Sequence, residues 1–430
     1  MSGAYLRSLI AAGDKAALMD ALDNPVLSAF ADDIDDKGRS LLHAALAADM
    51  PDAVPALMAA GARARTADAQ GRTALHIAAE KGYADICRLL LDAGLDINAR
   101  TGGGRFESPA ADMGDTALHL AIEGGHVDTA ALLLARGANP ALKNPDNKDG
   151  LNAWHAAAKC DNPAMIDLLL AHPEHARMND FCAQGRTHAD AFRLALREGH
   201  GAVVQRFIDH GIDVNRRDSE GHTPLHWLIL HRKTRAEALP MLKLLLKNGA
   251  DGDKAANLWG ETPLMVAAKA DFPEAMQLLL DKGADVTRLS NFRETALHFA
   301  ARHYTVETIH ILLDHGADIN APDRIGQTAL HIAAHHNRRD VVKTLVAHGA
   351  NPLLKDQRGR TPDLLCQAPV QETTRAIVVQ AQDVWRKGGR PVLENGRLRR
   401  RFNLQTRSAR RAGPPRFDKK PPSNGGGYQP

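Results

Sequence analysis

The stretch Thr73-Ala74-Leu75-His76-Ile77 decides the fold, because the same five residue types return at Thr328-Ala329-Leu330-His331-Ile332. Closely related four-residue versions begin at Thr116, Thr223, Thr262 and Thr295. The histidine or its substitute recurs after 33 residues, from His43 to His76, from Met265 to His298 and from His298 to His331. A fixed period of this length is typical of a solenoid, in which one small unit is repeated along the chain.

The unit that starts at Thr73 predicts two short helices. Thr73 precedes an apolar run, where its hydroxyl can accept a hydrogen bond from a backbone N–H of the first turn. Gly82 permits the chain reversal that ends the first helix. The run Leu89-Leu90-Leu91 places apolar surface on more than one side of the second helix. No single unit can bury this surface alone, so stability must come from stacking of neighbouring units.

The repeated unit resembles the ankyrin repeat. The resemblance is carried by Asp68–Ala79, Gly82, Ile86–Leu91 and Gly94–Ala99, and it covers roughly residues 5–385 as about ten tandem repeats with caps. It implies an all-α ankyrin repeat solenoid of helix-turn-helix units with hairpin loops. It also implies that the repeated histidine bridges the loops of adjacent repeats by hydrogen bonds, a role that applies to His43, His76, His119, His155, His226, His298 and His331.

Composition agrees with a linear array inside the cell. Aromatic residues make up only 4% of the chain, which suits thin, alanine-lined helices. No apolar run approaches the roughly 20 residues of a membrane span, and the N-terminus has no long apolar segment of a secretory signal. The four cysteines share no metal-ligand spacing, and Cys87 and Cys366 are predicted to be small core residues. We therefore expect a monomer that is located in the cytoplasm and holds no cofactor or metal. A location in the nucleus and secretion of the protein as an effector are left open as alternatives.

The departures from the repeat define the predicted domain organisation. Residues 1–35 form an N-terminal capping repeat, and residues 36–385 form the array, which ends in a C-capping helix over Glu372–Trp385. An inserted finger follows Ala99, and the array is irregular near residues 172–190. The positions that depart from the motif in repeats four and five predict the least stable part of the array; they are Asn152, Trp154, Asp190 and Arg193.

Residues 386–430 form a basic tail. They contain 13 Lys or Arg and 2 Asp or Glu, which gives a net charge of +11. The rest of the chain contains 41 basic and 49 acidic residues and has a net charge of −8. Proline pairs and a glycine run favour disorder. Arginine clusters can bind phosphates, so nucleic acid or another polyanion is an alternative partner for this tail. The residues predicted for that contact are Arg397, Arg399, Arg400, Arg401, Arg407, Arg410 and Arg411.

The hairpin tips carry the sharpest clue to function. In the family, the two residues before the turn glycine face a partner, and in most repeats of this chain they are polar or charged. In three consecutive repeats the second of them is instead Trp259, Phe292 or Ile325, with Leu258 beside Trp259. Behind these tips we place the exposed helix ends with Arg302, His303, His335 and His336. A row of large apolar side chains ringed by polar groups resembles an interface hot spot. The alternative is that these side chains pack locally on neighbouring tips.

An enzymatic function is the competing hypothesis. The sequence contains no HExxH, no phosphate-binding Walker loop and no paired-cysteine metal pattern. Only the segment His172–Cys182, which mixes His172, His175, Asp180 and Cys182, could hold chemistry, and its spacing is irregular. Arrays of the family are generally scaffolds for protein recognition. The sequence therefore predicts a non-enzymatic scaffold or adaptor that binds a protein partner through its repeats.

Overall fold

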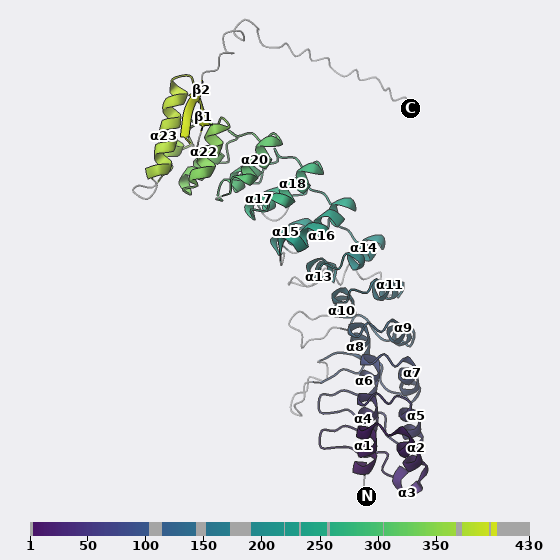
Figure 1. Cartoon of the computed structure of the whole chain (residues 1–430). Coiled ribbons are helices and arrows are strands. Elements are labelled where there is room, and N and C mark those ends of the chain that lie inside the picture. Colours follow the sequence, from purple (N-terminus) through teal and green to yellow (C-terminus); the bar gives the residue numbers. More distant parts are fainter. Residues whose placement is uncertain are drawn as a thin grey trace, which may run out of the picture. The chain divides into compact units, whose positions relative to one another are not determined.

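The computed structural model describes residues 3–102, 114–142, 152–172, 191–218, 220–231, 234–255, 259–303, 305–366, 372–394 and 397–401. The chain divides into two compact units, Met1–Ala284 and Asp285–Pro430. The first unit is all-α over its described residues. Its helices come in pairs, and Figure 1 shows α4, α6 and α8 stacked beside a second row that contains α5, α7 and α9.

The described part of the first unit consists of paired helices. The first helices of the pairs are α1 (Gly3–Ala12), α4 (Leu41–Ala47), α6 (Ala74–Glu80), α8 (Ala117–Glu123), α10 (Ala153–Lys159), α13 (Ala191–Glu198), α15 (Pro224–Leu230) and α17 (Pro263–Lys269). The second helices are α2 (Lys15–Asp23), α5 (Ala53–Ala59), α7 (Ala84–Asp92), α9 (Val127–Ala135), α11 (Pro163–Ala171), α14 (Gly201–Asp209), α16 (Arg235–Lys247) and α18 (Pro273–Asp281), and a short α3 (Pro25–Ser28) follows α2.

Several first helices are followed by a residue with positive φ that reverses the chain. Gly82 takes this conformation after α6, with φ of 79°. At the equivalent turns Asp49, Asp271 and Asn337 replace glycine and have φ of 55°, 48° and 56°. Asp and Asn tolerate the left-handed region better than other side chains because their short polar groups bond locally. The turn is therefore preserved in these three repeats, which lack the glycine of the motif.

The core lies between neighbouring pairs. Ala78 and Ala79 of α6 and Leu90 of α7 are completely buried. The small alanines let α6 approach α4 on one side and α8 on the other, and these helices are in contact. The leucine-rich second helices pack in the same way, as α7 does against α9. The stacking predicted from the sequence is thus present, and Cys87 and Cys366 are buried core residues as predicted.

The repeated histidine joins adjacent repeats. In α4 the Nδ1 atom of His43 lies 3.2 Å from the backbone nitrogen of Ser40, and Nε2 lies 2.8 Å from the carbonyl oxygen of Arg72 in the following repeat. The backbone N–H can only donate, so Nδ1 accepts and the ring proton resides on Nε2, which donates to the carbonyl. The predicted bridge is confirmed for four of the seven histidines: His43, His226, His298 and His331. His76 makes the equivalent contact with Ala99, at the end of its own repeat.

Two of the motif departures in repeats four and five keep the role of the residue they replace. Asn152 caps α10, since its side-chain oxygen lies 3.1 Å from the backbone nitrogen of Trp154. Arg193 stands where histidine stands elsewhere, and its guanidinium lies 2.9 Å from a carboxylate oxygen of Asp218 and 3.4 Å from the carbonyl oxygen of His222. Arg193 thus keeps a contact with the next repeat, while the low stability expected of this region stays a prediction. Residues 103–113 of the inserted finger and most of the irregular segment lie outside the described residues.

The second unit continues the repeat and adds a hairpin. Its helices are α19 (Ala296–Ala300), α20 (Glu307–Asp314), α21 (Ala329–His335), α22 (Arg339–Ala347), the 3₁₀ helix η2 (Pro362–Leu365) and α23 (Glu372–Arg386). Strands β1 (Arg390–Glu394) and β2 (Arg397–Arg401) pair antiparallel, and β1 contacts α22 and α23. The prediction of disorder from residue 386 onward is thus wrong for these two strands, because backbone pairing and contact with the last helices order them. Residues 402–430 lie outside the described part.

Candidate functional site

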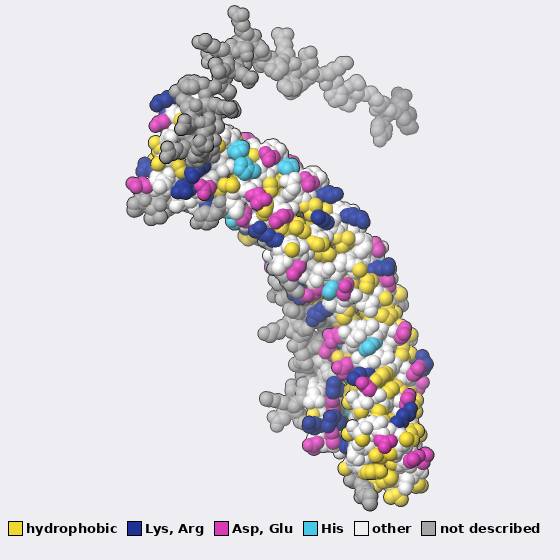
Figure 2. All heavy atoms as spheres, viewed as in Figure 1, with side chains coloured by type: hydrophobic (Ala, Val, Ile, Leu, Met, Phe, Trp, Pro, Cys, Tyr) yellow, Lys and Arg dark blue, Asp and Glu magenta, His cyan; other side chains and the backbone are white. Residues whose placement is uncertain are grey.

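Large apolar side chains reach the surface at several places. On the face shown in Figure 2, hydrophobic side chains alternate with charged ones over much of the first unit. Exposed apolar residues that stand singly are normal on folded proteins. A candidate site therefore needs exposed apolar side chains that are neighbours and that border a concave surface.

The tips of two hairpins in the second unit meet the first of these conditions. Phe292 and Ile325 are 44% and 51% exposed. The carbonyl oxygen of Phe292 lies 2.8 Å from the backbone nitrogen of Arg324, which joins the two tips directly. Each tip is held by a side chain at its base, because Ser290 accepts from the backbone of Phe292 and Asp323 accepts from that of Ile325, at 3.2 and 2.9 Å. The apolar side chains are therefore held at the surface by turns that do not depend on burying them.

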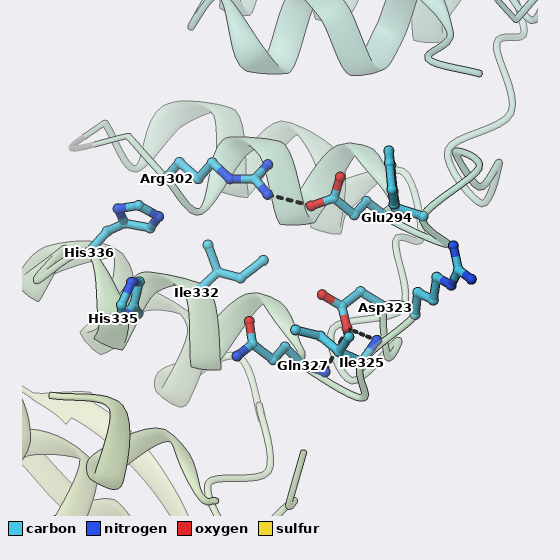
Figure 3. A pocket seen from close by; sticks show the side chains of 10 residues that line it. Glu294, Arg302, Asp323, Ile325, Gln327, Ile332, His335 and His336 are labelled. Carbon is cyan, nitrogen blue, oxygen red and sulfur yellow. Dashed lines mark hydrogen bonds and ion pairs between the residues drawn. The ribbon is translucent and has the colours of Figure 1, made fainter. Parts of the chain in front are cut away.

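A pocket of about 270 Å³ lies beside these tips and meets the second condition. Phe292 and Ile325 border it on the hairpin side, and Ile332 of α21 forms an apolar part of its wall. Figure 3 shows Ile332 between the histidine pair on one side and the hairpin residues Ile325 and Gln327 on the other. The pocket is lined in full by Phe292, Glu294, Arg302, Asp323, Arg324, Ile325, Gln327, Ile332, His335 and His336.

The two acidic side chains of the pocket are already engaged. Glu294 forms an ion pair with Arg302 across the wall (Figure 3). Asp323 accepts from the backbone nitrogens of Ile325 and Gln327, at 2.9 and 2.8 Å. The pKa of His336 is lowered, first by burial and then by its neighbours, which include His335 and the guanidinium groups of Arg302 and Arg338. Two guanidinium groups, those of Arg302 and Arg338, therefore lie near this side of the pocket.

The predicted partner-binding residues are distributed over both units. Phe292, Ile325, Arg302, His335 and His336 come together at the pocket, whereas His303 is half-buried in the same unit and does not line it. Trp259 belongs to the first unit, is 49% exposed and lies with its ring centroid 5.5 Å from Nζ of Lys269. Lys269 is the last residue of α17, so this contact is with a helix and not with a neighbouring tip. The expected row of Trp259, Phe292 and Ile325 includes residues of both units, and it stays a prediction. Leu258 lies outside the described residues.

Sequence reasoning missed five residues of the pocket wall. They are Glu294, Asp323, Arg324, Gln327 and Ile332. Ile332 is 33 residues beyond Phe299, at a position of the first helix that is buried in both repeats, so the period gives no signal for it. The ion pair of Glu294 with Arg302 joins residues eight apart, and the same spacing joins Arg72 to Glu80 and Glu261 to Lys269. Opposite charges at this spacing are thus a signal that could have indicated Glu294.

The remaining predicted sites are described only in part. Arg397, Arg399, Arg400 and Arg401 belong to strand β2, and Arg407, Arg410 and Arg411 lie outside the described residues. Of the segment that could hold chemistry, only His172 is described, at the end of α11. Among the described residues there is no group of three His, Cys, Asp or Glu side chains that could hold a metal ion. Within the same ranges, every helix is too short or too polar to cross a bilayer.

Comparison with family models identifies the class of protein. A model of ankyrin repeats in three copies matches residues 9–101, 105–182, 192–290 and 264–356. A second model, of ankyrin repeats in many copies, matches residues 75–134. The chain therefore belongs to the ankyrin repeat family, whose repeats are generally protein-interaction modules.

Individual relatives share only part of the chain. Neurogenic locus notch homolog protein 1 of Xenopus laevis is 29% identical over 127 residues, which are 28% of this chain and 5% of that protein. Neurogenic locus Notch protein of Drosophila melanogaster is 32% identical over 117 residues, 25% of this chain and 4% of that protein. Inversin of Homo sapiens is 27% identical over 220 residues, 50% of this chain and 19% of that protein. The chain thus spans a small fraction of the length of these relatives.

Proposed function

We propose that the chain is an adaptor that holds a protein partner on the second unit, at the pocket between the hairpin tips and helix α21. The observation that carries this proposal is the pair of neighbouring tips, Phe292 and Ile325, whose large apolar side chains are exposed beside a concave wall. Their exposure costs free energy in water, and a partner that covers them recovers it. The general role of ankyrin repeats in protein interaction supports the same function.

A comparison of captured proteins tests the proposal. The immobilised full chain and its Phe292→Ser/Ile325→Ser variant are incubated with a cell extract, and the retained proteins are quantified. Removal of a hot-spot side chain typically costs about 2 kcal/mol or more, so the double variant should lose its specific partner. Val26→Ser is the matched control, because Val26 is an exposed aliphatic residue of the first unit. Equal capture by all three proteins would move the interface elsewhere.

The basic tail supports a second function, binding of nucleic acid or another polyanion. Strand β2 holds four arginines within five residues, and it is paired in register with β1 from Arg390↔Arg401 to Glu394↔Arg397. An ordered strand loses less conformational entropy on binding than a disordered tail. The test is binding of a labelled single-stranded DNA at several salt concentrations. Affinity should fall steeply with salt, and replacing Arg397, Arg399, Arg400 and Arg401 by Gln should weaken binding and reduce this slope.

A further inference from the structure

We propose that the pocket of the second unit selects an acidic peptide segment, with one large apolar side chain against Phe292, Ile325 and Ile332 and a neighbouring carboxylate facing Arg302 and Arg324. This inference rests on the proposed function, because it names the chemistry of the partner at the same site. Three features of the site carry it: the size of the pocket, its charge and the residues of the surrounding tips.

The size of the pocket indicates a side chain as its occupant. Sites that enclose a whole small ligand usually measure about 300–1,000 Å³. The volume of about 270 Å³ is below this range, and exposed hairpin tips border the pocket. A single aromatic or branched side chain of a longer segment fits these conditions, with the rest of the segment lying over Phe292 and Ile325.

The charge of the pocket indicates an acidic neighbour for that side chain. Glu294 is paired with Arg302, and Asp323 is occupied by two backbone N–H groups. Arg302 keeps further donors after this pairing, since a guanidinium carries five N–H groups. Arg324 stands exposed at the tip beside Ile325. A carboxylate placed beside Arg324 meets the positive charge of this exposed guanidinium, whereas a cation at the same place would be repelled by it.

The hairpin tips of the second unit also carry positive charge. Their exposed residues include Arg293, Arg324 and Arg358, and none of the described tip positions at 291–293, 324–326 and 357–359 is acidic. The tips are adjacent, since the carbonyl oxygen of Ile325 lies 3.0 Å from the backbone nitrogen of Gln357. The chain's own tail at 386–430 carries a net charge of +11 and is a poor occupant for this reason. Charge complementarity therefore favours an acidic segment of another protein.

A random-peptide selection tests the inference before any natural partner is identified. Phage that display random 12-residue peptides are selected on the immobilised full chain. The enriched peptides should carry a large apolar residue within three positions of Asp or Glu. The best peptide is then synthesised with a fluorescent label, and its affinity is measured by anisotropy for the wild type and for variants.

Charge reversal at the tips provides the decisive comparison. Arg324→Glu and Ile325→Asp should each weaken the peptide by about tenfold or more, since a like charge or a lost apolar contact costs over about 1.4 kcal/mol. Lys37→Glu is the matched control, because it makes the same charge change at an exposed tip of the first unit, and it should leave the affinity within about twofold. Circular dichroism melting confirms that each variant folds, and Ile325→Ser replaces Ile325→Asp if the latter does not.

The outcomes separate this inference from the function on which it rests. Peptides that need Ile325 but carry no acidic residue, or that tolerate Arg324→Glu, overturn the inference and leave the adaptor function intact. Displacement of the peptide by an unlabelled oligonucleotide as readily as by unlabelled peptide also overturns it, because the site would then bind polyanions in general. If no peptide is enriched that depends on Phe292, Ile325 or Arg324, both the inference and the proposed interface fail.

Discussion

The Nε2 atom of His298 lies 3.1 Å from the carbonyl oxygen of Gln327, so one imidazole ties the first helix of a repeat to the hairpin of the next. The other ring nitrogen lies 3.0 Å from the backbone nitrogen of Thr295 and can only accept there. This second contact requires the neutral ring. A second proton on the ring would face the Thr295 N–H and break the contact at the start of its own helix.

We predict that acid destabilises the array between about pH 6.5 and about pH 4. Burial lowers the pKa of the bridging histidines, and that of His226 falls to about 4 from an ordinary value of 6.5. The unfolded chain therefore binds more protons than the folded chain in this range. The stabilising contribution of these rings is complete above about pH 6.5 and is lost as the pH falls towards about 4. The loss is about 1.4 kcal/mol per histidine for each unit by which its pKa is lowered. Urea unfolding at several pH values measures it.

His226→Met isolates the contribution of one ring. Met265 takes the histidine position in another repeat, where its sulfur lies 3.4 Å from the backbone nitrogen of Thr262. The variant should be less stable at about pH 7.5 and should show a shallower loss of stability between about pH 6.5 and 4. Asp35 and Asp356 have lowered pKa values, so their contribution to stability is lost only below about pH 3.8 and does not overlap with that of the histidines. A urea midpoint that stays constant from about pH 7.5 to pH 5 would contradict the prediction.

Truncation of a stacked leucine should be costly. Leu279 of α18 is 1% exposed, and α18 packs against α16 and α17. Leu279→Ala should lower the free energy of unfolding by roughly 2–5 kcal/mol, because it leaves a cavity between helices. Leu364→Ala is the control, since Leu364 is 56% exposed, and it should cost less than about 0.5 kcal/mol. Chemical denaturation measures both, and similar losses for the two variants would show that stacking does not dominate.

Arg193 should be more important than its departure from the motif suggests. Its side chain and that of Asp218 are nearly buried, and they form an ion pair at 2.9 Å. Arg193→Ala should cost roughly 3 kcal/mol, because it leaves a nearly buried carboxylate without its guanidinium partner. Native-state hydrogen exchange should show that α13 and α15 open more readily in the variant than in the wild type. Unchanged exchange would mean that the array does not use this contact.

Much of the fold could be predicted from the repeat. The period, the Thr-x-x-His pattern and the glycine turns determine where helices such as α6 and α7 begin and end, because each depends on local contacts. The bridging histidines were also predictable, since one contact is copied from repeat to repeat. The role of Arg193 was not, because a pattern records residue identity and not the reach of a longer side chain to Asp218.

The candidate site was predictable only in part, for a similar reason. Phe292 and Ile325 stand out because they break a polar pattern at a position that faces outward in the family. The pocket wall arises from contacts between two repeats, such as the ion pair of Glu294 with Arg302 and the turn that Asp323 makes under Ile325. These contacts depend on side chains that are ordinary within each repeat. Only the assembled second unit shows which of them surround a concave surface.

Our last prediction concerns Trp259, which belongs to the first unit but occupies the same tip position as Phe292 and Ile325. If all three contact one partner, Trp259→Ser should weaken capture by about tenfold or more, as expected for a large aromatic anchor. The ring lies against Lys269, whose amine lies 2.9 Å from Glu261, so the ion pair remains when the ring is removed. The melting temperature should therefore stay close to that of the wild type.

The triple variant Trp259→Ser/Phe292→Ser/Ile325→Ser should abolish partner capture and still fold. Val26→Ser again controls for the loss of an exposed apolar residue. Capture and melting temperature are measured on the same preparations. An unfolded triple variant would show that the three side chains stabilise the array, which is the local-packing alternative. A folded triple variant that retains every partner would exclude these tips as the interface and direct the search to the inserted finger at Thr101–Pro109 or to the basic tail. Loss of capture in Phe292→Ser/Ile325→Ser but not in Trp259→Ser would confine the interface to the second unit.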